Sequence, residues 1–277
     1  MTPHYLTDTP ILKLLILCLL LISHSAVGLT LEGDYVQGGM LIGDVSAGDS
    51  VQFNGKPVKV SKSGEFLLGF DRDAPLSHKI VVSHEGQPKQ SRQFTIKKRK
   101  YQIQNIDGLP PSKVTPPKRN WDRIKKEVAL VKQARKMNED RSDFQNGFIW
   151  PSKGVISGVF GSQRVLNGKP KRPHYGVDVA APVGTLVVSP ADGVVTMTHP
   201  DMFYSGGTLI IDHGLHLSSS FLHLSKILVQ EGDVVKQGDP IAEIGATGRV
   251  TGPHLDWRMN LGAARIDPQL LVPPMPK

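Results

Sequence analysis

The sequence of 277 residues has one cysteine, Cys18, and only 6% aromatic side chains. A single cysteine can form neither an internal disulfide nor a cysteine zinc site, so any metal must be bound by histidine and carboxylate side chains. No apolar run reaches the roughly 18–20 residues of a transmembrane helix, which excludes a polytopic membrane protein. The hydrophobic content of 39% excludes a disordered chain, and the length allows one large domain or two smaller ones.

The longest apolar run lies near the N-terminus. Residues 14–22 are uniformly apolar, Lys13 precedes them, and Ala26-Val27-Gly28 follows as a small–x–small sequence. This order is typical of a cleaved secretory signal peptide. We therefore predict a signal peptide over residues 1–28 and an exported protein, periplasmic or secreted, with no stable membrane span after cleavage. The alternative is a buried N-terminal helix.

The net charge is +8, and the basic residues concentrate in residues 97–100 and 113–136. A basic chain can bind nucleic acid, but an exported one meets an anionic cell envelope instead. We therefore predict no nucleic-acid partner. The simpler alternative is a solvated basic face without a partner.

Residues 29–104 show short apolar segments separated by turns. Apolar residues alternate in 51–53, and Asn54-Gly55 is typical of a hairpin turn before the next segment at 58–60. This spacing predicts a small β-sandwich-like domain over residues 29–104. We expect this domain to position or restrain the rest of the chain.

Residues 105–147 are predicted to connect two domains. Four prolines between residues 107 and 118 indicate a linker. A basic amphipathic helix is then predicted over residues 121–137, with membrane contact as a minor alternative. Its apolar positions, expected to pack on a domain, are Trp121, Ile124, Val128, Val131 and Ala134.

Short β segments with glycine-rich turns return from residue 148 onward, and they predict an antiparallel β domain over residues 148–277. The predicted fold class is therefore mainly β, with a small N-terminal sandwich-like domain, a linking helix and a C-terminal antiparallel domain.

Five side chains in this last domain are candidates for metal binding or proton transfer: His174, Asp178, His223, His254 and Asp256. Zinc accepts imidazole nitrogens and carboxylate oxygens, and zinc hydrolases use three protein ligands with one open position. On a strand, His254 and Asp256 share one face, about 6.6 Å apart along the chain. His174 and Asp178 would be about 13 Å apart on a straight strand, so they can bind one ion only if the chain bends, and Gly176 lies where that bend is needed.

The segments around these residues form an ordered set of motifs. They include RPHYGVD at 172–178, IDHG at 211–214, HLSKI at 223–227, GATGR at 245–249 and TGPHLD at 251–256. In this order they resemble the lysostaphin-like (LytM-type) zinc peptidase family, over residues from about 150 to 270. The resemblance implies a LytM-type peptidase domain that cuts peptide bonds in bacterial cell-wall peptidoglycan.

The resemblance also implies a role for each candidate residue. His174 and Asp178 match the His-x-x-x-Asp motif, whose members bind zinc (Zn²⁺). His223 and His254 match the active-site histidines that transfer protons or bind the oxyanion. Asp256 lies where the family has a second histidine in its His-x-His motif, as the third metal ligand.

These matches predict a zinc-dependent endopeptidase that uses a metal-bound water as nucleophile on peptidoglycan peptides, with other cell-wall enzymes as further partners. The alternative is a catalytically silent LytM-type regulator that activates a peptidoglycan amidase. A third interpretation is a biotinyl- or lipoyl-type carrier, because residues 232–244 resemble such domains. The nearby lysines, Lys226 and Lys236, lack the hairpin-tip setting that a carrier needs.

The aspartate at position 256 changes the charge of the predicted site. An ion held by two neutral imidazoles and one carboxylate has a net charge of +1, whereas one imidazole and two carboxylates reduce it to 0. A less positive site lowers the pKa of bound water less. The sequence thus suggests activity at somewhat higher pH than in relatives with histidine.

Overall fold

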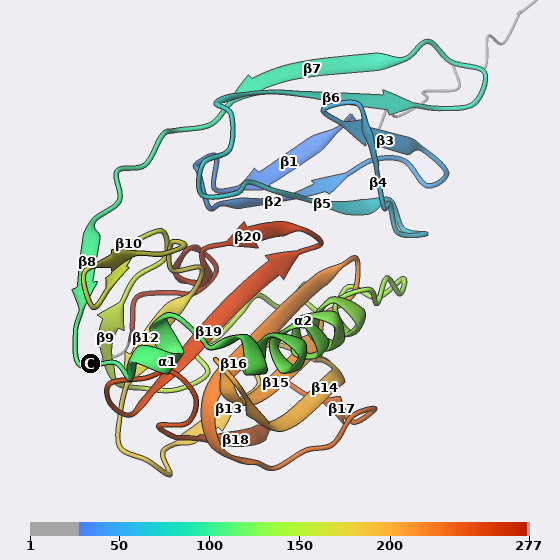
Figure 1. The fold of residues 1–277 in the computed structure, drawn as a ribbon. Coiled ribbons are helices and arrows are strands. Elements are labelled where there is room, and N and C mark those ends of the chain that lie inside the picture. Colours follow the sequence, from blue (N-terminus) through green and yellow to red (C-terminus); the bar gives the residue numbers. More distant parts are fainter. Residues whose placement is uncertain (1–27, 276–277) are drawn as a thin grey trace, which may run out of the picture.

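The computed structural model describes residues 28–275 (Figure 1). The predicted fold class is confirmed: the described chain is mainly β, its sheets are largely antiparallel, and a helix links the two parts. The predicted signal peptide, with Cys18, lies outside the described residues except for Gly28. No helix within residues 28–275 is long and apolar enough to cross a bilayer.

The N-terminal part contains two small antiparallel sheets, in the orders β1-β2-β5 and β4-β3-β6-β7. Their strands are β1 (Thr30–Gly33), β2 (Met40–Asp44), β3 (Ser50–Phe53), β4 (Lys56–Val58), β5 (Glu65–Gly69), β6 (Ser77–Ser83) and β7 (Gln90–Thr95). The predicted hairpin turn is confirmed, because Asn54 and Gly55 both have positive φ and Phe53 pairs with Lys56.

Side chains from both small sheets meet in one apolar cluster. Leu41 and Phe66 from the first sheet and Val51 and Ile80 from the second are almost completely buried in it. Removal of this apolar surface from water holds the two sheets together.

The segment predicted as a linker is more regular than its prolines suggest. Strand β8 (Ile103–Ile106) pairs in parallel with β10 (Gln163–Leu166), and β11 (Lys169–Pro170) completes a three-stranded sheet. Helix α1 (Pro111–Val114), a 3₁₀ turn (Lys118–Asn120) and α2 (Trp121–Ala134) follow. The partner strand of β8 is distant in sequence, so local composition could not reveal this pairing.

The helix is confirmed, but its predicted packing face is partly wrong. Ile124, Val131 and Ala134 are at least partly buried as expected, whereas Trp121 and Val128 are 49% and 57% exposed. Glu127 is buried in their place, because its carboxylate accepts hydrogen bonds from the Arg123 side chain (2.7 Å) and the Phe203 backbone N–H (2.8 Å). A paired carboxylate can be buried, which apolar periodicity does not predict.

The C-terminal part is built on one large antiparallel sheet, whose main path is β17-β14-β15-β16-β19-β12-β9. Its strands are β9 (Val155–Gly158), β12 (Val177–Ala180), β13 (Leu186–Val188), β14 (Gly193–Met202), β15 (Gly206–Asp212), β16 (Leu217–Ile227), β17 (Val234–Val235), β18 (Pro240–Ile244), β19 (His254–Leu261) and β20 (Ala264–Ile266). A 3₁₀ turn (Pro268–Leu270) follows β20.

The two parts pack directly on each other, with β5 against β19 and β20 (Figure 1). A side chain at Gly69 would lie 2.8 Å from Ile266, so the missing Cβ permits this close approach. Arg99 pairs with the buried carboxylate of Asp267 at 2.7 Å. The N-terminal part is therefore fixed on the back of the sheet that carries the candidate site.

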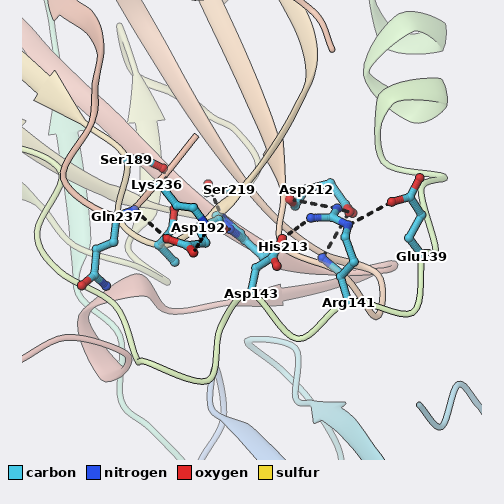
Figure 2. Close-up of polar contacts among 12 residues, drawn as sticks. Glu139, Arg141, Asp143, Ser189, Asp192, Asp212, His213, Ser219, Lys236 and Gln237 are labelled. Carbon is cyan, nitrogen blue, oxygen red and sulfur yellow. Dashed lines mark hydrogen bonds and ion pairs between the residues drawn. The ribbon is translucent and has the colours of Figure 1, made fainter. Parts of the chain in front are cut away.

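Arg141 ties the segment after α2 to the end of β15 (Figure 2). Its guanidinium pairs with Glu139 at 2.9 Å and also with Asp143 and Asp212. Asp212 is almost fully buried, and this burial raises the pKa of its carboxyl, with Arg141 as the main opposing influence. Arg141 therefore opposes the protonation of Asp212 that burial favours.

His213 lies beside this cluster and is a structural histidine (Figure 2). Its ring bonds to the Asp192 carbonyl (2.6 Å) and the Ser219 hydroxyl (2.7 Å). Burial lowers its pKa to about 4, so the ring is neutral at pH 7. Because His213 and Ser219 are completely buried, this Ser–His pair has no access to a substrate.

Replacing Arg141 by methionine should reduce the free energy of unfolding by about 3 kcal/mol at pH 7, because the buried Asp212 carboxylate loses its cation. The loss should shrink as the pH falls and Asp212 becomes protonated. Urea unfolding at several pH values measures both effects. Lys226→Met, which removes an exposed pair with Glu243 (3.9 Å), should change stability by less than about 0.5 kcal/mol; equal losses in the two variants would contradict the expectation.

Candidate metal centre and active site

Two neighbouring strands, β12 and β19, bring the predicted metal ligands together. They run antiparallel with Asp178 directly opposite Asp256, and His174 lies just before β12. One ligand atom from each of these three residues lies within 4.8 Å of the other two. All three side chains are buried. The structure thus places the three predicted ligands at one point.

Strand alternation directs the side chains of β19. Leu255, Trp257 and Met259 are completely buried in the core. Because successive residues of a strand point to opposite faces, the alternate residues face the candidate site. These are His254, Asp256 and Arg258.

Two glycines make room for the carboxylates. A Cβ at Gly158 would lie 2.3 Å from Asp178 Oδ2, and one at Gly176 would lie 2.6 Å from Asp256 Oδ1. The predicted bend is confirmed, because the chain bends at Gly176 directly before β12 begins. Gly176 is also needed for space, and His174 reaches the site because it precedes the strand rather than continuing it.

The donor atoms fit a divalent cation such as zinc. Nδ1 of His174 is buried without a hydrogen-bond partner, and His174 Nε2 and Asp178 Oδ1, both buried, have only each other at 3.0 Å. Buried polar atoms without partners are rare, and a cation among them would satisfy the carboxylate oxygen and one imidazole nitrogen. One nitrogen and two carboxylate oxygens are a suitable ligand set for zinc.

Two arginines that were not predicted contact the carboxylates. Arg164 donates to Asp178 Oδ2 at 2.6 Å, and Arg258 donates through Nε and Nη2 to the two oxygens of Asp256 at 2.9 and 2.5 Å. Burial would raise the pKa of Asp256, but contact with Arg258 lowers this pKa well below its usual value. The alternation of β19 could have identified Arg258. Arg164 lies on β10 in a separate sheet, so the alternation of β19 could not identify it.

His223 and His254 form a second pair beside the ligands, with their ring centroids 4.9 Å apart. Nδ1 of His223 faces the Thr247 carbonyl (2.8 Å), and Nδ1 of His254 faces the Gly252 carbonyl (2.9 Å). Since a carbonyl can only accept, each Nδ1 carries the proton and each neutral ring keeps Nε2 as an acceptor. His254 Nε2 lies 3.9 Å from Asp178 Oδ1.

The environment of His223 is unusual in two respects. Its φ of 68° lies in the left-handed region, which a residue with a side chain rarely adopts. Burial lowers its pKa to about 4. Strained backbone of this kind is typical of functional sites.

The segment after β8 is attached at two places. The Asn167 side chain bonds the Leu109 backbone N–H (3.2 Å) and carbonyl (2.7 Å). Four residues on, Lys113 donates from Nζ to the Phe203 carbonyl (2.5 Å), and its own carbonyl accepts from Arg249 (3.4 Å).

Both attachments involve segments that also contact candidate site residues. Asn167 directly follows β10, whose Arg164 contacts Asp178. Arg249 follows closely after Thr247, the partner of His223. Residues 109–113 are therefore bonded to two segments that flank the site, and His254, the most accessible of the five candidate residues, has a side chain that is only 18% exposed.

Comparison with known proteins agrees with the resemblance seen in the motifs. Residues 172–268 match the model of peptidase family M23, so the chain contains a domain of this LytM-type family. The match covers His174, Asp178, His223, His254 and Asp256.

Individual relatives match over parts or most of the chain. The peptidoglycan DD-endopeptidases ShyA and ShyB of Vibrio cholerae are each 47% identical, over 112 and 89 residues, which cover 39% and 31% of this chain. The matched segments span only 25% and 20% of those relatives. A solved structure of a candidate M23 peptidase from Pseudomonas aeruginosa is 28% identical with a TM-score of 0.66, covering 86% of this chain and 95% of that one.

Gly158→Ala should weaken zinc binding at least about tenfold, because the new methyl group displaces the Asp178 carboxylate. Gly252→Ala is a matched control close to the same site, since a Cβ there meets nothing within 4 Å. Competition with a chromophoric chelator measures both dissociation constants. Equal affinities in the two variants would show that the position of Asp178 does not depend on Gly158.

Proposed function

We propose that this chain, which carries a peptidase family M23 domain, is a zinc-dependent endopeptidase that hydrolyses peptide bonds in bacterial peptidoglycan. The convergence of His174, Asp178 and Asp256 beside the His223–His254 pair is the observation that carries this proposal. The names of the relatives, peptidoglycan DD-endopeptidases, support the substrate class.

In this proposal, His174, Asp178 and Asp256 hold the zinc ion. Zinc, when bound, polarises the scissile carbonyl and lowers the pKa of water. His254 and His223 transfer protons at Nε2, because a backbone carbonyl fixes the proton of each ring at Nδ1. The same bonds hold both rings in the orientation that proton transfer needs.

The other parts of the chain have proposed roles as well. We propose a signal peptide at residues 1–28 that directs export to the periplasm or medium, where peptidoglycan is accessible. Residues 29–104 form a domain that positions the peptidase domain at 148–277, and residues 105–147 connect the two. The contacts of β5 with β19 and β20 support this positioning role.

Purified mature protein should release soluble peptide fragments from isolated sacculi, which mass spectrometry identifies. Removal of metal by a chelator should abolish the release, and added zinc should restore it. His254→Ala should reduce the rate at least about 100-fold, because it removes a proton carrier. His199→Ala, which changes a histidine outside the site, should retain the wild-type rate.

Digestion that survives complete metal removal would overturn the zinc mechanism. Absence of digestion by zinc-loaded protein, together with stimulation of a separate amidase, would instead support the silent regulator.

The path of residues 109–113 leads to a further expectation. We expect this segment to restrict the approach of a substrate peptide to the histidines, so Asn167→Ala, which removes both bonds to Leu109, should increase the rate of sacculus digestion several-fold. Limited proteolysis should detect faster cleavage between residues 105 and 117. Lys169→Ala, which removes a single exposed bond to Thr115, is the control. An unchanged digestion rate with a released segment would show that the segment does not limit access.

A further inference from the structure

Arg258 is oriented toward Asp256 by the strand that carries both. The two residues alternate with the buried Trp257 on β19, so both side chains lie on the face of the candidate site. The guanidinium donates one hydrogen bond to each oxygen of Asp256. The Asp256 side chain is 1% exposed and that of Arg258 26%, so the ion pair is largely shielded from solvent.

The backbone leaves space for this pair. A Cβ at Gly176 would lie 2.6 Å from Arg258 Cγ and 2.6 Å from Asp256 Oδ1. Gly176 lies between His174 and Asp178 in the sequence. The segment that supplies two candidate ligands is therefore shaped to admit the arginine together with the third.

The pair also changes the charge of the site. Asp178 and Asp256 are direct register partners, so two buried carboxylates lie side by side, and each is bonded to one arginine. The ion and its three ligands alone have a net charge of zero. With Arg258 included, the unit at position 256 has a net charge of zero, equal to the neutral imidazole that the resembling family has there.

We infer that Arg258 is a positioning residue that makes Asp256 a neutral third ligand for the metal. This inference rests on the proposed zinc peptidase function. Arg258 fixes both carboxylate oxygens through its planar fork. Each oxygen keeps a second lone pair, so the bonds to arginine leave Asp256 able to bind an ion.

If the ion pair of Arg258 and Asp256 were purely structural, removing Arg258 would have different effects. It would lower the stability of the protein, and any change in zinc affinity would be the same whichever residue occupies position 256. A positioning role makes the effect of Arg258 depend on its partner. With histidine at position 256, Arg258 would be an unpaired cation beside a metal cation and would oppose binding.

The test uses zinc dissociation constants of the mature full-length chain, measured by competition with a chromophoric chelator. Four chains are compared: wild type, Arg258→Gln, Asp256→His and the double variant. In the aspartate background, Arg258→Gln should weaken zinc binding about 10- to 100-fold, as is typical for partners of metal ligands. In the histidine background, the same replacement should tighten binding. The sign of the effect is therefore expected to reverse.

Arg265→Gln is the matched control. Arg265 lies on the adjacent strand β20, carries the same charge and does not contact Asp256. Its replacement should leave both dissociation constants nearly unchanged, which separates the specific pair from a general effect of positive charge. The absorption spectrum of the cobalt-substituted protein should change with Arg258→Gln and not with Arg265→Gln. Only Arg258 is bonded to a proposed metal ligand, Asp256.

Thermal melting of the metal-free chains shows whether each variant folds. If Arg258→Gln does not fold, Arg258→Lys replaces it, because lysine keeps the charge without the two-pronged bond and should still weaken zinc binding. An effect of the same sign in both backgrounds, or no effect, would overturn the role of Arg258 while wild-type zinc binding still supports the proposed function. A wild-type chain that binds no zinc would overturn the proposed function itself.

Discussion

The antiparallel register of β12 and β19 determines the chemistry of the site, because it sets Asp178 directly opposite Asp256. A shift of one residue would turn His254 and Asp256 into the core and bring Trp257 to the surface. The fully buried side chains of Leu255, Trp257 and Met259 oppose such a shift. Packing of the apolar face of β19 therefore fixes which side chains lie on its polar face.

That register also brings two like charges together in a buried place. The molecule offsets the repulsion with Arg164 on one carboxylate and Arg258 on the other. Each arginine uses part of the hydrogen-bonding capacity of its carboxylate, while Asp178 Oδ1 contacts only His174 Nε2 and His174 Nδ1 remains without a partner. The potential metal-ligand atoms of His174, Asp178 and Asp256 lie close together, and a cation bound among them would complete this arrangement.

The sequence predicted the fold class, the helix near residue 121 and the ligand candidates, because these depend on local spacing and on motifs. It did not predict Arg164, the buried Glu127 or the strand β8, because each depends on a partner distant in the sequence: Asp178 on another sheet, the Phe203 backbone and β10. Gly176 shows the same limit. The bend at this residue was predicted, but the room that it leaves for Asp256 and Arg258 is visible only in three dimensions.

The buried charges also bear on whether this site is active or silent. Buried ion pairs contribute little to stability, and apolar residues of similar volume often replace them with no loss or with a gain. The structure holds two carboxylates, two arginines and a histidine with one unpaired ring nitrogen close together beneath its surface. A site that holds an ion accounts for this group of buried polar side chains. The two histidines beside it, each with its Nδ1 bonded to a backbone carbonyl, fit the proposed hydrolase function.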